Sequence, residues 1–238
     1  MVNISAIIQA RMGSTRLPGK VLMKLNEDTV LSLLLKQLRY SEFLTEIIIA
    51  TTTNPEDDII EKFAKSNNIK LFRGSSNDVL DRYYQCAKKF SLNHIVRVTA
   101  DNPLLDPKIL DNIIKFYKKE NFDYVNNVTK RTFPYGTEVE IFSFSVLEHM
   151  WKNAKTLFDK EHVTPYIHNN PDKFRSKCIE NTIDYSYLHW TIDFIEDFKL
   201  VQALTIKIKN RPILFQNILE LFVKEPELKK INQITSKN

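Results

Sequence analysis

The sequence predicts an α/β fold, in which a mixed but mainly parallel β-sheet carries helices on both faces. Short apolar runs alternate with longer amphipathic segments through the first half of the chain, which is typical of consecutive strand–helix units. The short runs are apolar almost without interruption, as expected for strands buried on both faces of a parallel sheet. After residue 121 strand-like runs of a different pattern follow, which indicates antiparallel additions to the sheet.

Four strand–helix units account for the first half of the chain. The expected strands are residues 4–8, 47–51, 69–72 and 95–99, and the expected helices are residues 30–38, 57–65, 79–90 and 107–119. Local signals mark three helix starts, because Asn and Asp cap helix N-termini and Pro fits the first turn. These signals are Asn54-Pro55, Asn77-Asp78 and Asp106-Pro107.

The second half of the chain is expected to form a small antiparallel, dimerisation-type lobe at about residues 124–185. Residues 137–142 alternate between apolar and polar, as in a strand, and residues 145–153 are expected to be helical. Antiparallel strands are expected at 178–183 and 187–192, and the segment 124–136 is loop-like. We expect the lobe to belong to a single domain over residues 1–223. Residues 224–238 are expected to be a solvated C-terminal tail.

Composition narrows the class of protein. With 238 residues, 43% hydrophobic and 26% charged, the chain suits one globular unit. It shows neither a signal-type N-terminus nor an apolar stretch near the roughly 20 residues of a membrane span, so we expect a cytoplasmic protein without a membrane partner. Cys86 and Cys178 are expected to be reduced core residues. The net charge of +5 is spread along the chain, which favours an anionic substrate over nucleic acid.

The most informative segment is the loop at residues 9–20, QARMGSTRLPGK, between the first expected strand and the first expected helix. It holds two of the chain's four glycines together with Arg11, Arg16 and Lys20. Backbone N–H groups and fixed cations of such a loop can converge on a polyphosphate. The chain lacks both G-x-G-x-x-G and G-x-x-x-x-G-K-[ST], which argues against a dinucleotide oxidoreductase and an ordinary phosphate-loop NTPase.

Two aspartates are candidate ligands of a magnesium ion. Open α/β sheets bind ligands at the carboxyl ends of their strands, and Asp101 emerges there from the strand at 95–99. Asp193 follows another strand-like run and precedes a helix. Because Mg²⁺ needs only one or two carboxylates and takes its other ligands from water and phosphate, Asp101 and Asp193 together predict its site. The alternative for each is a helix cap or a turn.

A second group of polar residues is expected to face an acceptor. Glu138 and Glu140 alternate on one face of a strand, where they can bind hydroxyl groups or form an exposed strand face. Tyr135 lies just before this strand, and His189 is the histidine expected near Asp193. The basic loop and the two aspartates predict nucleotidyl transfer, in which the acceptor oxygen attacks the α-phosphorus and pyrophosphate leaves toward the basic loop. No protein nucleophile is required for this reaction, and none is indicated.

The string AIIQARMGSTRLPGKVL at residues 6–22 resembles the nucleotide-binding motif of the cytidylyltransferases that activate acidic sugars. These are the acylneuraminate and 3-deoxy-manno-octulosonate enzymes, and the resemblance is closest to their relatives in spore-coat polysaccharide biosynthesis. It continues through FRGSSNDVLDRYYQCAKK, VRVTADNPLLDP, PYGTEVEIFSF, HVTPYIHNNPDKF and WTIDFIEDF. The loop at residues 14–18 departs from the pattern of the sialic-acid-activating enzymes, which leaves the acceptor open.

The resemblance implies a CTP-dependent, homodimeric enzyme with the Rossmann-like fold of the nucleotide-diphospho-sugar transferases. Arg11 and Lys20 would grip the triphosphate and Asp101 and Asp193 would hold Mg²⁺, so that Arg11, Lys20 and Asp101 are the expected catalytic residues. The expected nucleotide contacts are Ala10, Arg11, Gly13, Ser14, Lys20, Arg73, Ser75, Asp81 and Arg82. The expected acceptor contacts are Tyr135, Glu138, Glu140 and His189.

Three functions are therefore open from the sequence. The first is transfer of CMP from CTP to an acidic sugar or phosphorylated acceptor for surface polysaccharide or glycoconjugate biosynthesis. The second is a glycosyltransferase of similar fold, in which Asp101 would hold a metal that bridges the diphosphate of a nucleotide sugar. The third is a non-catalytic nucleotide-binding subunit, which would not need Asp101 and Asp193. Release of pyrophosphate from CTP distinguishes the first from the others.

Overall fold

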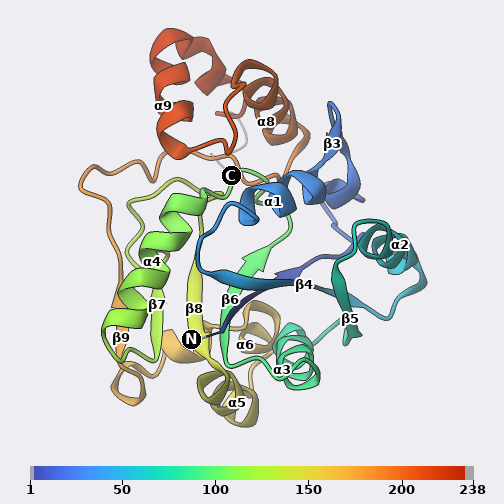
Figure 1. Ribbon diagram of the computed structural model, residues 1–238, viewed down its shortest axis with the longest axis vertical. Helices are drawn as coiled ribbons and strands as arrows, with labels where there is room; N and C mark the ends of the chain where they lie inside the picture. The colour runs from blue at the N-terminus through green and yellow to red at the C-terminus, as the bar shows by residue number, and fades with distance from the viewer. Residues whose placement is uncertain (1–2, 234–238) are drawn as a thin grey trace.

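The computed structural model describes residues 3–233, which are built on a seven-stranded mixed sheet (Figure 1). The strands are β1 (Ile4–Gln9), β4 (Leu44–Thr52), β5 (Lys70–Gly74), β6 (His94–Thr99), β7 (Tyr124–Asn126), β8 (Glu140–Ser143) and β9 (Ser176–Cys178). Their spatial order is β5-β4-β1-β6-β8-β7-β9. Only β8 in this sheet runs antiparallel to its neighbours, so the predicted mixed, mainly parallel sheet is confirmed.

Helices cover both faces of the sheet. One face carries α1 (Val30–Leu38), α2 (Asp58–Ser66) and α4 (Pro107–Lys119), and the other carries α3 (Val79–Lys89), α5 (Phe144–Asn153), α6 (Leu157–His162) and α7 (Pro165–His168). Consecutive residues of one strand enter opposite cores, because strand side chains alternate between faces: Ile8 packs with the first set and Ile7 with the second. No helix within residues 3–233 is long and apolar enough to cross a bilayer.

The helix-start signals read from the sequence have different outcomes. Asp78 caps α3 by accepting a hydrogen bond from the backbone N–H of Asp81, and Asp106 caps α4 in the same way. Asn54-Pro55 instead opens a 3₁₀ turn, η2 (Pro55–Asp57), so that α2 begins one residue later than expected. This shift leaves the side chain of Asp57 free for a different role, described below.

A third hydrophobic cluster lies beside the sheet and holds the C-terminal helices α8 (Ile195–Lys207) and α9 (Phe215–Lys224), drawn together at the top of Figure 1. The following 3₁₀ turn, η4 (Pro226–Lys230), also packs there, with Leu228 and Asn232 buried. Asn232 donates hydrogen bonds to the backbone of His189 and to Asp197. Residues 224–233 thus pack on the domain instead of extending as a solvated tail, and residues 234–238 of the expected tail lie outside the described residues.

The lobe at 124–185 differs in several respects from the expectation. Its first segment is not all loop, because β7 starts at Tyr124. The strand expected over 178–183 is not formed beyond Cys178, where the edge strand β9 ends, and β9 pairs with β7 in parallel where an antiparallel addition was predicted. Residues 187–192 form no strand and contribute a single parallel bridge between Tyr135 and His189. Cys86 is buried as predicted, whereas Cys178 on the edge strand is only half-buried.

A small second sheet, which the sequence pattern did not reveal, accompanies the main one. β2 (Lys24–Leu25) and β3 (Asp28–Thr29) form a two-stranded antiparallel hairpin just before α1. Asn26 in its turn has φ 55, a left-handed conformation that Asn adopts more readily than most residues. Strands of this length are too short to show a two-residue periodicity.

Candidate functional site

The chain order of the strands creates a crevice at the carboxyl edge of the sheet. From β1 the chain passes to β4 and β5 on one side, and then returns to place β6 on the other side of β1. Gln9 and Thr99, the last residues of β1 and β6, are register partners. The loops that follow the two strands therefore leave the sheet side by side, at the topological switch point where α/β sheets bind ligands.

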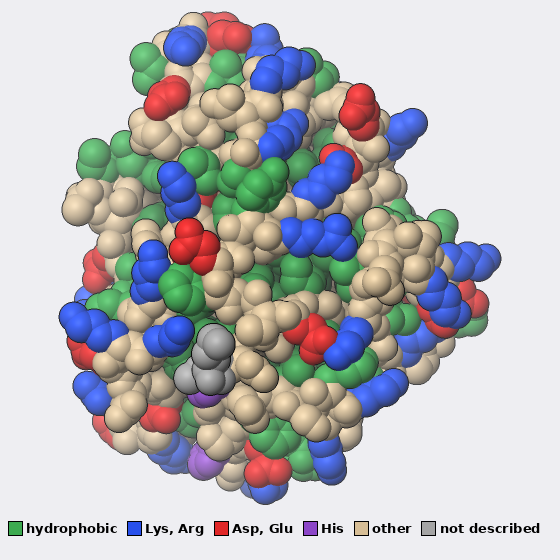
Figure 2. Space-filling model, in the orientation of Figure 1, with side chains coloured by type: hydrophobic (Ala, Val, Ile, Leu, Met, Phe, Trp, Pro, Cys, Tyr) green, Lys and Arg blue, Asp and Glu red, His purple; other side chains and the backbone are tan. Residues whose placement is uncertain are grey.

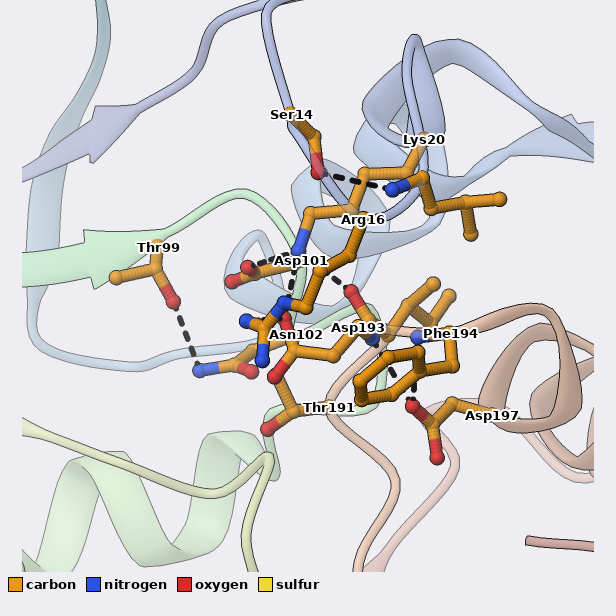
Figure 3. A network of polar contacts seen from close by, with 12 residues as sticks. Ser14, Arg16, Lys20, Thr99, Asp101, Asn102, Thr191, Asp193, Phe194 and Asp197 are labelled. Atoms are coloured by element: carbon orange, nitrogen blue, oxygen red, sulfur yellow. Dashed lines mark hydrogen bonds and ion pairs between the residues drawn. The ribbon is translucent and has the colours of Figure 1, made fainter. Parts of the chain in front are cut away.

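Lys20 and two aspartates meet at this point (Figure 3). The ammonium Nζ of Lys20 lies 2.7 Å from Asp101 Oδ2, 3.0 Å from Asp193 Oδ1 and 2.6 Å from the carbonyl oxygen of Ile192. Lys20 is only 8% exposed, and a cation withdrawn from water to this extent needs counter-charges. The loop cation and the two predicted metal ligands are thus brought together from three distant parts of the chain.

Arg16 adds a second cation to the cluster. Its Nη2 donates to Asp193 Oδ1 at 2.6 Å, and its guanidinium lies 5.1 Å from the centre of the Phe194 ring. Figure 3 shows the side chains of Arg16 and Lys20 converging on Asp193 from the same loop. Two cations and two carboxylates balance one another here.

The two aspartates are available for this cluster because other residues cap the neighbouring helices. Asp197 Oδ2 accepts hydrogen bonds from the backbone N–H groups of Asp193 and Phe194 at the start of α8. Asp106 caps α4, and the backbone carbonyl of Asp101 accepts from Ile192. The carboxylate of Asp193 therefore contacts cations of the loop and does not cap the helix.

The opposite side of the basic loop is held by Asp57, which the sequence analysis did not single out. Its carboxylate is fully buried and accepts from the backbone N–H of Met12 at 2.7 Å, and from both the N–H and the hydroxyl of Thr52. The neighbouring Glu56 approaches Gly13 so closely that a Cβ on Gly13 would lie 2.6 Å from its Oε1. Asp57 thus joins the loop after β1 to the end of β4. Its signal in the sequence was Asn54-Pro55, which already opens the helical segment and leaves the Asp57 side chain without a capping role.

We expect Asp57→Ala to reduce the free energy of unfolding by about 2–3 kcal/mol, because it leaves buried donors of Met12 and Thr52 unpaired. Loosening the loop should also weaken nucleotide binding. Urea denaturation and calorimetric titration with CTP measure the two effects. Asp58→Ala is the matched control, since its exposed pair with Arg73 contributes under about 1 kcal/mol. Equal stability of the two variants would contradict this role.

Five further predicted nucleotide contacts lie along the same edge. Ala10 is buried directly after β1, whereas Arg11 and Gly13 are exposed. Ser14 Oγ accepts from the backbone N–H of Leu17 and so shapes the loop. Ser75 follows β5, and its hydroxyl accepts from the N–H of Asp78 at the start of α3.

Arg82 is the most unusual of the predicted nucleotide contacts. It is 2% exposed, and its Nη1 donates to the carbonyl of Ser75 at 2.6 Å while its Nε has no partner. Within the described part of the chain no carboxylate forms a hydrogen bond or ion pair with it. Burial lowers the pKa of Arg82, and the neighbouring Arg11 lowers it further. A buried guanidinium without an acidic partner is suited to receive an anion.

Arg73 and Asp81 are engaged elsewhere. Arg73 donates to Asp58 at 2.6 Å and to Glu61 at 3.0 Å, and also to one backbone carbonyl at the end of β4 and one just after it. Asp81 Oδ1 accepts from Gln85 on its own helix and from Trp151 on α5. The structure does not join either side chain to the cluster around Lys20.

Three of the four predicted acceptor contacts lie together beside the cluster. The centre of the Tyr135 ring lies 3.8 Å from the guanidinium carbon of Arg131, and the ring stacks on His189 with 5.4 Å between ring centres. Glu138 accepts from Arg131 at 2.7 Å and from Asn102, the neighbour of Asp101, at 2.9 Å. These contacts fasten the segment before β8 to the loop that carries Asp101.

Gly136 permits this close arrangement. It has φ 104, and a Cβ at this position would lie 2.5 Å from Cδ1 of Trp190 and 2.9 Å from the backbone nitrogen of Thr191. Only glycine combines this backbone conformation with so little space. Its N–H donates to Glu138 Oε2 at 2.8 Å.

Glu140, the fourth predicted acceptor contact, lies apart from the other three. It is buried within the sheet, where it is ion-paired with Arg97 and accepts from the hydroxyl of Tyr124, which also contacts His168 Nε2 at 3.0 Å. Burial opposes the charge on Glu140, but Arg97 and Tyr124 outweigh it and hold its pKa below the ordinary value. Both Arg97 and Glu140 need this pairing, because each would otherwise be an uncompensated buried charge.

The donors of the cluster suit a hard cation. Residues 3–233 contain no group of three or more His, Cys, Asp and Glu side chains that could hold a metal ion. Mg²⁺ does not require such a group, because one or two carboxylates suffice when phosphate and water supply the rest. Asp101 and Asp193 already bind one shared cation, the Lys20 ammonium, so their geometry fits a single positive ion between them.

An open α/β sheet with a basic glycine loop facing two aspartates at its switch point defines a class of nucleotide-binding proteins. Residues 5–237 match the model of the family described as cytidylyltransferase, and the chain belongs to this family. It is accordingly a nucleotidyltransferase, and the resemblance read from the sequence motifs is confirmed.

Three similar proteins can be aligned with most or nearly all of the chain. The spore coat polysaccharide biosynthesis protein SpsF of Bacillus subtilis is 36% identical over 89% of this chain and 90% of its own length. An uncharacterised protein of Methanocaldococcus jannaschii is 40% identical over 97% of this chain and 95% of its own. A cytidylyltransferase structure from Leptospira borgpetersenii superposes with a TM-score of 0.91 at 35% identity, covering 96% of this chain and 97% of that one.

Proposed function

We propose that the protein transfers CMP from CTP to an acidic sugar or a phosphorylated acceptor and releases pyrophosphate. The observation that carries this proposal is the meeting of Lys20 and Arg16 with Asp101 and Asp193 at the switch point of the sheet. Membership of the cytidylyltransferase family supports CTP as the donor. The name of the Bacillus subtilis relative supports a role in the assembly of surface polysaccharide or glycoconjugate.

In this proposal Arg11, Lys20 and Asp101 are the catalytic residues. Arg11 and Lys20 bind the triphosphate, together with the backbone of the loop from Ala10 through Gly13 to Ser14. The buried guanidinium of Arg82 and the loop at Ser75 complete the nucleotide site, because an unpaired buried cation favours an anionic ligand. Arg73 and Asp81, whose side chains bind other protein groups, would support this site by holding the segments after β4 and along α3.

Asp101 and Asp193 would hold Mg²⁺. When bound there, the ion would neutralise phosphate charge and orient the α-phosphate for attack. The protein's own part is to fix the two carboxylates, through the Asp197 cap and the Asp101–Ile192 backbone bond, before the substrates arrive.

The reaction needs no covalent intermediate with the protein. An acceptor oxygen forms a bond to the α-phosphorus in line with the oxygen that bridges it to the β-phosphate, and that second bond breaks. Pyrophosphate leaves with the bonding electrons toward Lys20 and Arg16, whose charges stabilise it. A phosphate acceptor requires no proton transfer, whereas a sugar hydroxyl gives up one proton to solvent water.

The acceptor would lie over Tyr135, Glu138 and His189. These residues border Asp101 through the Asn102–Glu138 hydrogen bond and present an aromatic ring, a carboxylate and an imidazole on one side of the crevice. Glu140 would act on this face from within the sheet, by fixing the start of β8 through its pair with Arg97.

A pyrophosphate-release screen tests the function. CTP, UTP, ATP and GTP are each incubated with Mg²⁺ and a panel of sugar acids and sugar phosphates. We expect CTP to exceed the other nucleotides by at least about tenfold with one class of acceptor. Nucleotide-sugar consumption without pyrophosphate release would instead support a glycosyltransferase, and no turnover with any pair would contradict the proposed reaction.

We further propose a cytoplasmic homodimer that associates through the lobe at about residues 124–185 of one continuous domain. Its partners would be CTP and the anionic acceptor, with neither nucleic acid nor a membrane. On the face drawn in Figure 2, Lys and Arg side chains are interspersed with Asp and Glu, which is consistent with this assignment. Light scattering checks the assembly, and a monomer mass would contradict it.

A further inference from the structure

The two carboxylates proposed to hold Mg²⁺ are already neutralised by cations of the protein itself. Lys20 Nζ lies between Asp101 Oδ2 and Asp193 Oδ1, and Arg16 Nη2 lies 2.6 Å from the same oxygen of Asp193. We propose that Lys20 and Arg16 form an internal lock on the metal site, which opens when CTP draws both cations toward its phosphates. This inference rests on the proposed function and adds to it a coupling between metal and nucleotide.

Lys20 and a metal ion would compete for the same oxygens. An ion that coordinates Asp101 Oδ2 and Asp193 Oδ1 must displace the ammonium, because both oxygens lie within 3.0 Å of Nζ and two cations at this separation repel strongly. Replacing the two protein cations by one metal ion leaves the net charge around Asp101 and Asp193 unchanged, because the ion carries two positive charges and Lys20 and Arg16 carry one each. Without nucleotide, the released cations would have no counter-charge, which opposes the exchange.

The structure allows the lock to open without refolding. The backbone of Lys20 is held in the 3₁₀ turn η1 (Lys20–Leu22), which Gly19 precedes with φ 73, and the next residue, Val21, is buried. Only the torsions of the long Lys20 side chain must change. The Arg16 side chain is 53% exposed, so it can leave Asp193 freely. The charged groups of both side chains would then still belong to the loop that faces the triphosphate.

The coupling must be reciprocal. CTP binds more tightly when the two cations are free, and the metal binds more tightly when the two carboxylates are free. Each ligand therefore raises the affinity for the other by the same factor, as thermodynamic linkage requires. The site is then complete only when metal and nucleotide are both bound.

Binding of Mn²⁺ to the nucleotide-free protein tests the lock, measured by electron paramagnetic resonance of the free ion. We expect Lys20→Met to bind Mn²⁺ on the order of tenfold more tightly than the unaltered protein, because the internal competitor is gone. Lys24→Met is the matched control, since Lys24 is exposed on β2, and it should bind Mn²⁺ as the unaltered protein does. Arg16→Met, a change at a largely exposed side chain, should give a smaller increase and serves if Lys20→Met does not fold.

The outcomes separate the lock from the function on which it rests. Asp101→Asn should abolish the tight Mn²⁺ binding of Lys20→Met. If Mn²⁺ binding depends on Asp101 but neither Lys20→Met nor Arg16→Met strengthens it, the lock is wrong and the proposed metal site stands. If Asp101→Asn leaves Mn²⁺ binding unchanged in every background, the metal site itself is wrong, and the lock fails with it.

Discussion

Asp101→Asn is expected to lower the rate of CMP transfer by about three orders of magnitude at saturating CTP, while the protein remains folded. The substitution keeps the shape of the side chain but removes the charge that faces Lys20 and the proposed metal ion. The backbone carbonyl that binds Ile192 is unaffected. Pyrophosphate release measures the rate, and thermal unfolding followed by circular dichroism verifies the fold.

Asp172→Asn provides the control for this substitution, because Asp172 is exposed in the 3₁₀ turn η3 (Pro171–Lys173), which leads into the edge strand β9, whereas the site lies at the ends of β1 and β6. It should turn over at the unaltered rate. Metal-dependent turnover retained by Asp101→Asn would remove Asp101 from the catalytic residues, even if the family assignment is unaffected.

Glu140→Gln is expected to give the largest loss of stability, about 3–5 kcal/mol in the free energy of unfolding by urea. The change removes one charge of the ion pair between β6 and β8 and leaves the largely buried guanidinium of Arg97 without its counter-charge. The double variant Arg97→Met with Glu140→Leu should recover much of the loss, because it removes both charges. A stable Glu140→Gln protein with a raised KM for the acceptor would instead assign Glu140 to the acceptor site.

The same pair predicts a dependence of stability on pH. The folded state lowers the pKa of Glu140 below the ordinary value for a glutamate, so the folded protein binds its proton less readily than the unfolded chain. The contribution of Glu140 is therefore fully present above the unfolded pKa and is lost as the pH falls through the lower, folded value. Urea midpoints measured from neutral to acid pH should decline less in the Arg97→Met, Glu140→Leu double variant.

Local sequence patterns predicted the elements that are long and strongly periodic. The strands β1, β4, β5 and β6 and the helices α1 to α4 match the expected positions closely, because uninterrupted apolar runs and amphipathic segments arise from burial within each element. The hairpin of β2 and β3 and the strand β7 were missed because two or three residues carry no measurable period. The direction of β9 was wrong, since strand pairing depends on neighbours distant in the chain.

The sequence by itself determined the mainly parallel sheet, the basic loop between residues 9 and 20, and the two aspartates that follow apolar runs. These features are local, and the rule that ligands bind at carboxyl ends of parallel strands places them on one edge. Only the tertiary structure decided which charges meet there. Lys20 and Asp193 are separated by 173 residues, and nothing in either segment indicates that the ammonium lies between both carboxylates. Likewise, Glu140 is buried and forms an ion pair with Arg97. The partner of a charged residue is set by how the strands pack, and not by the residues next to it along the chain.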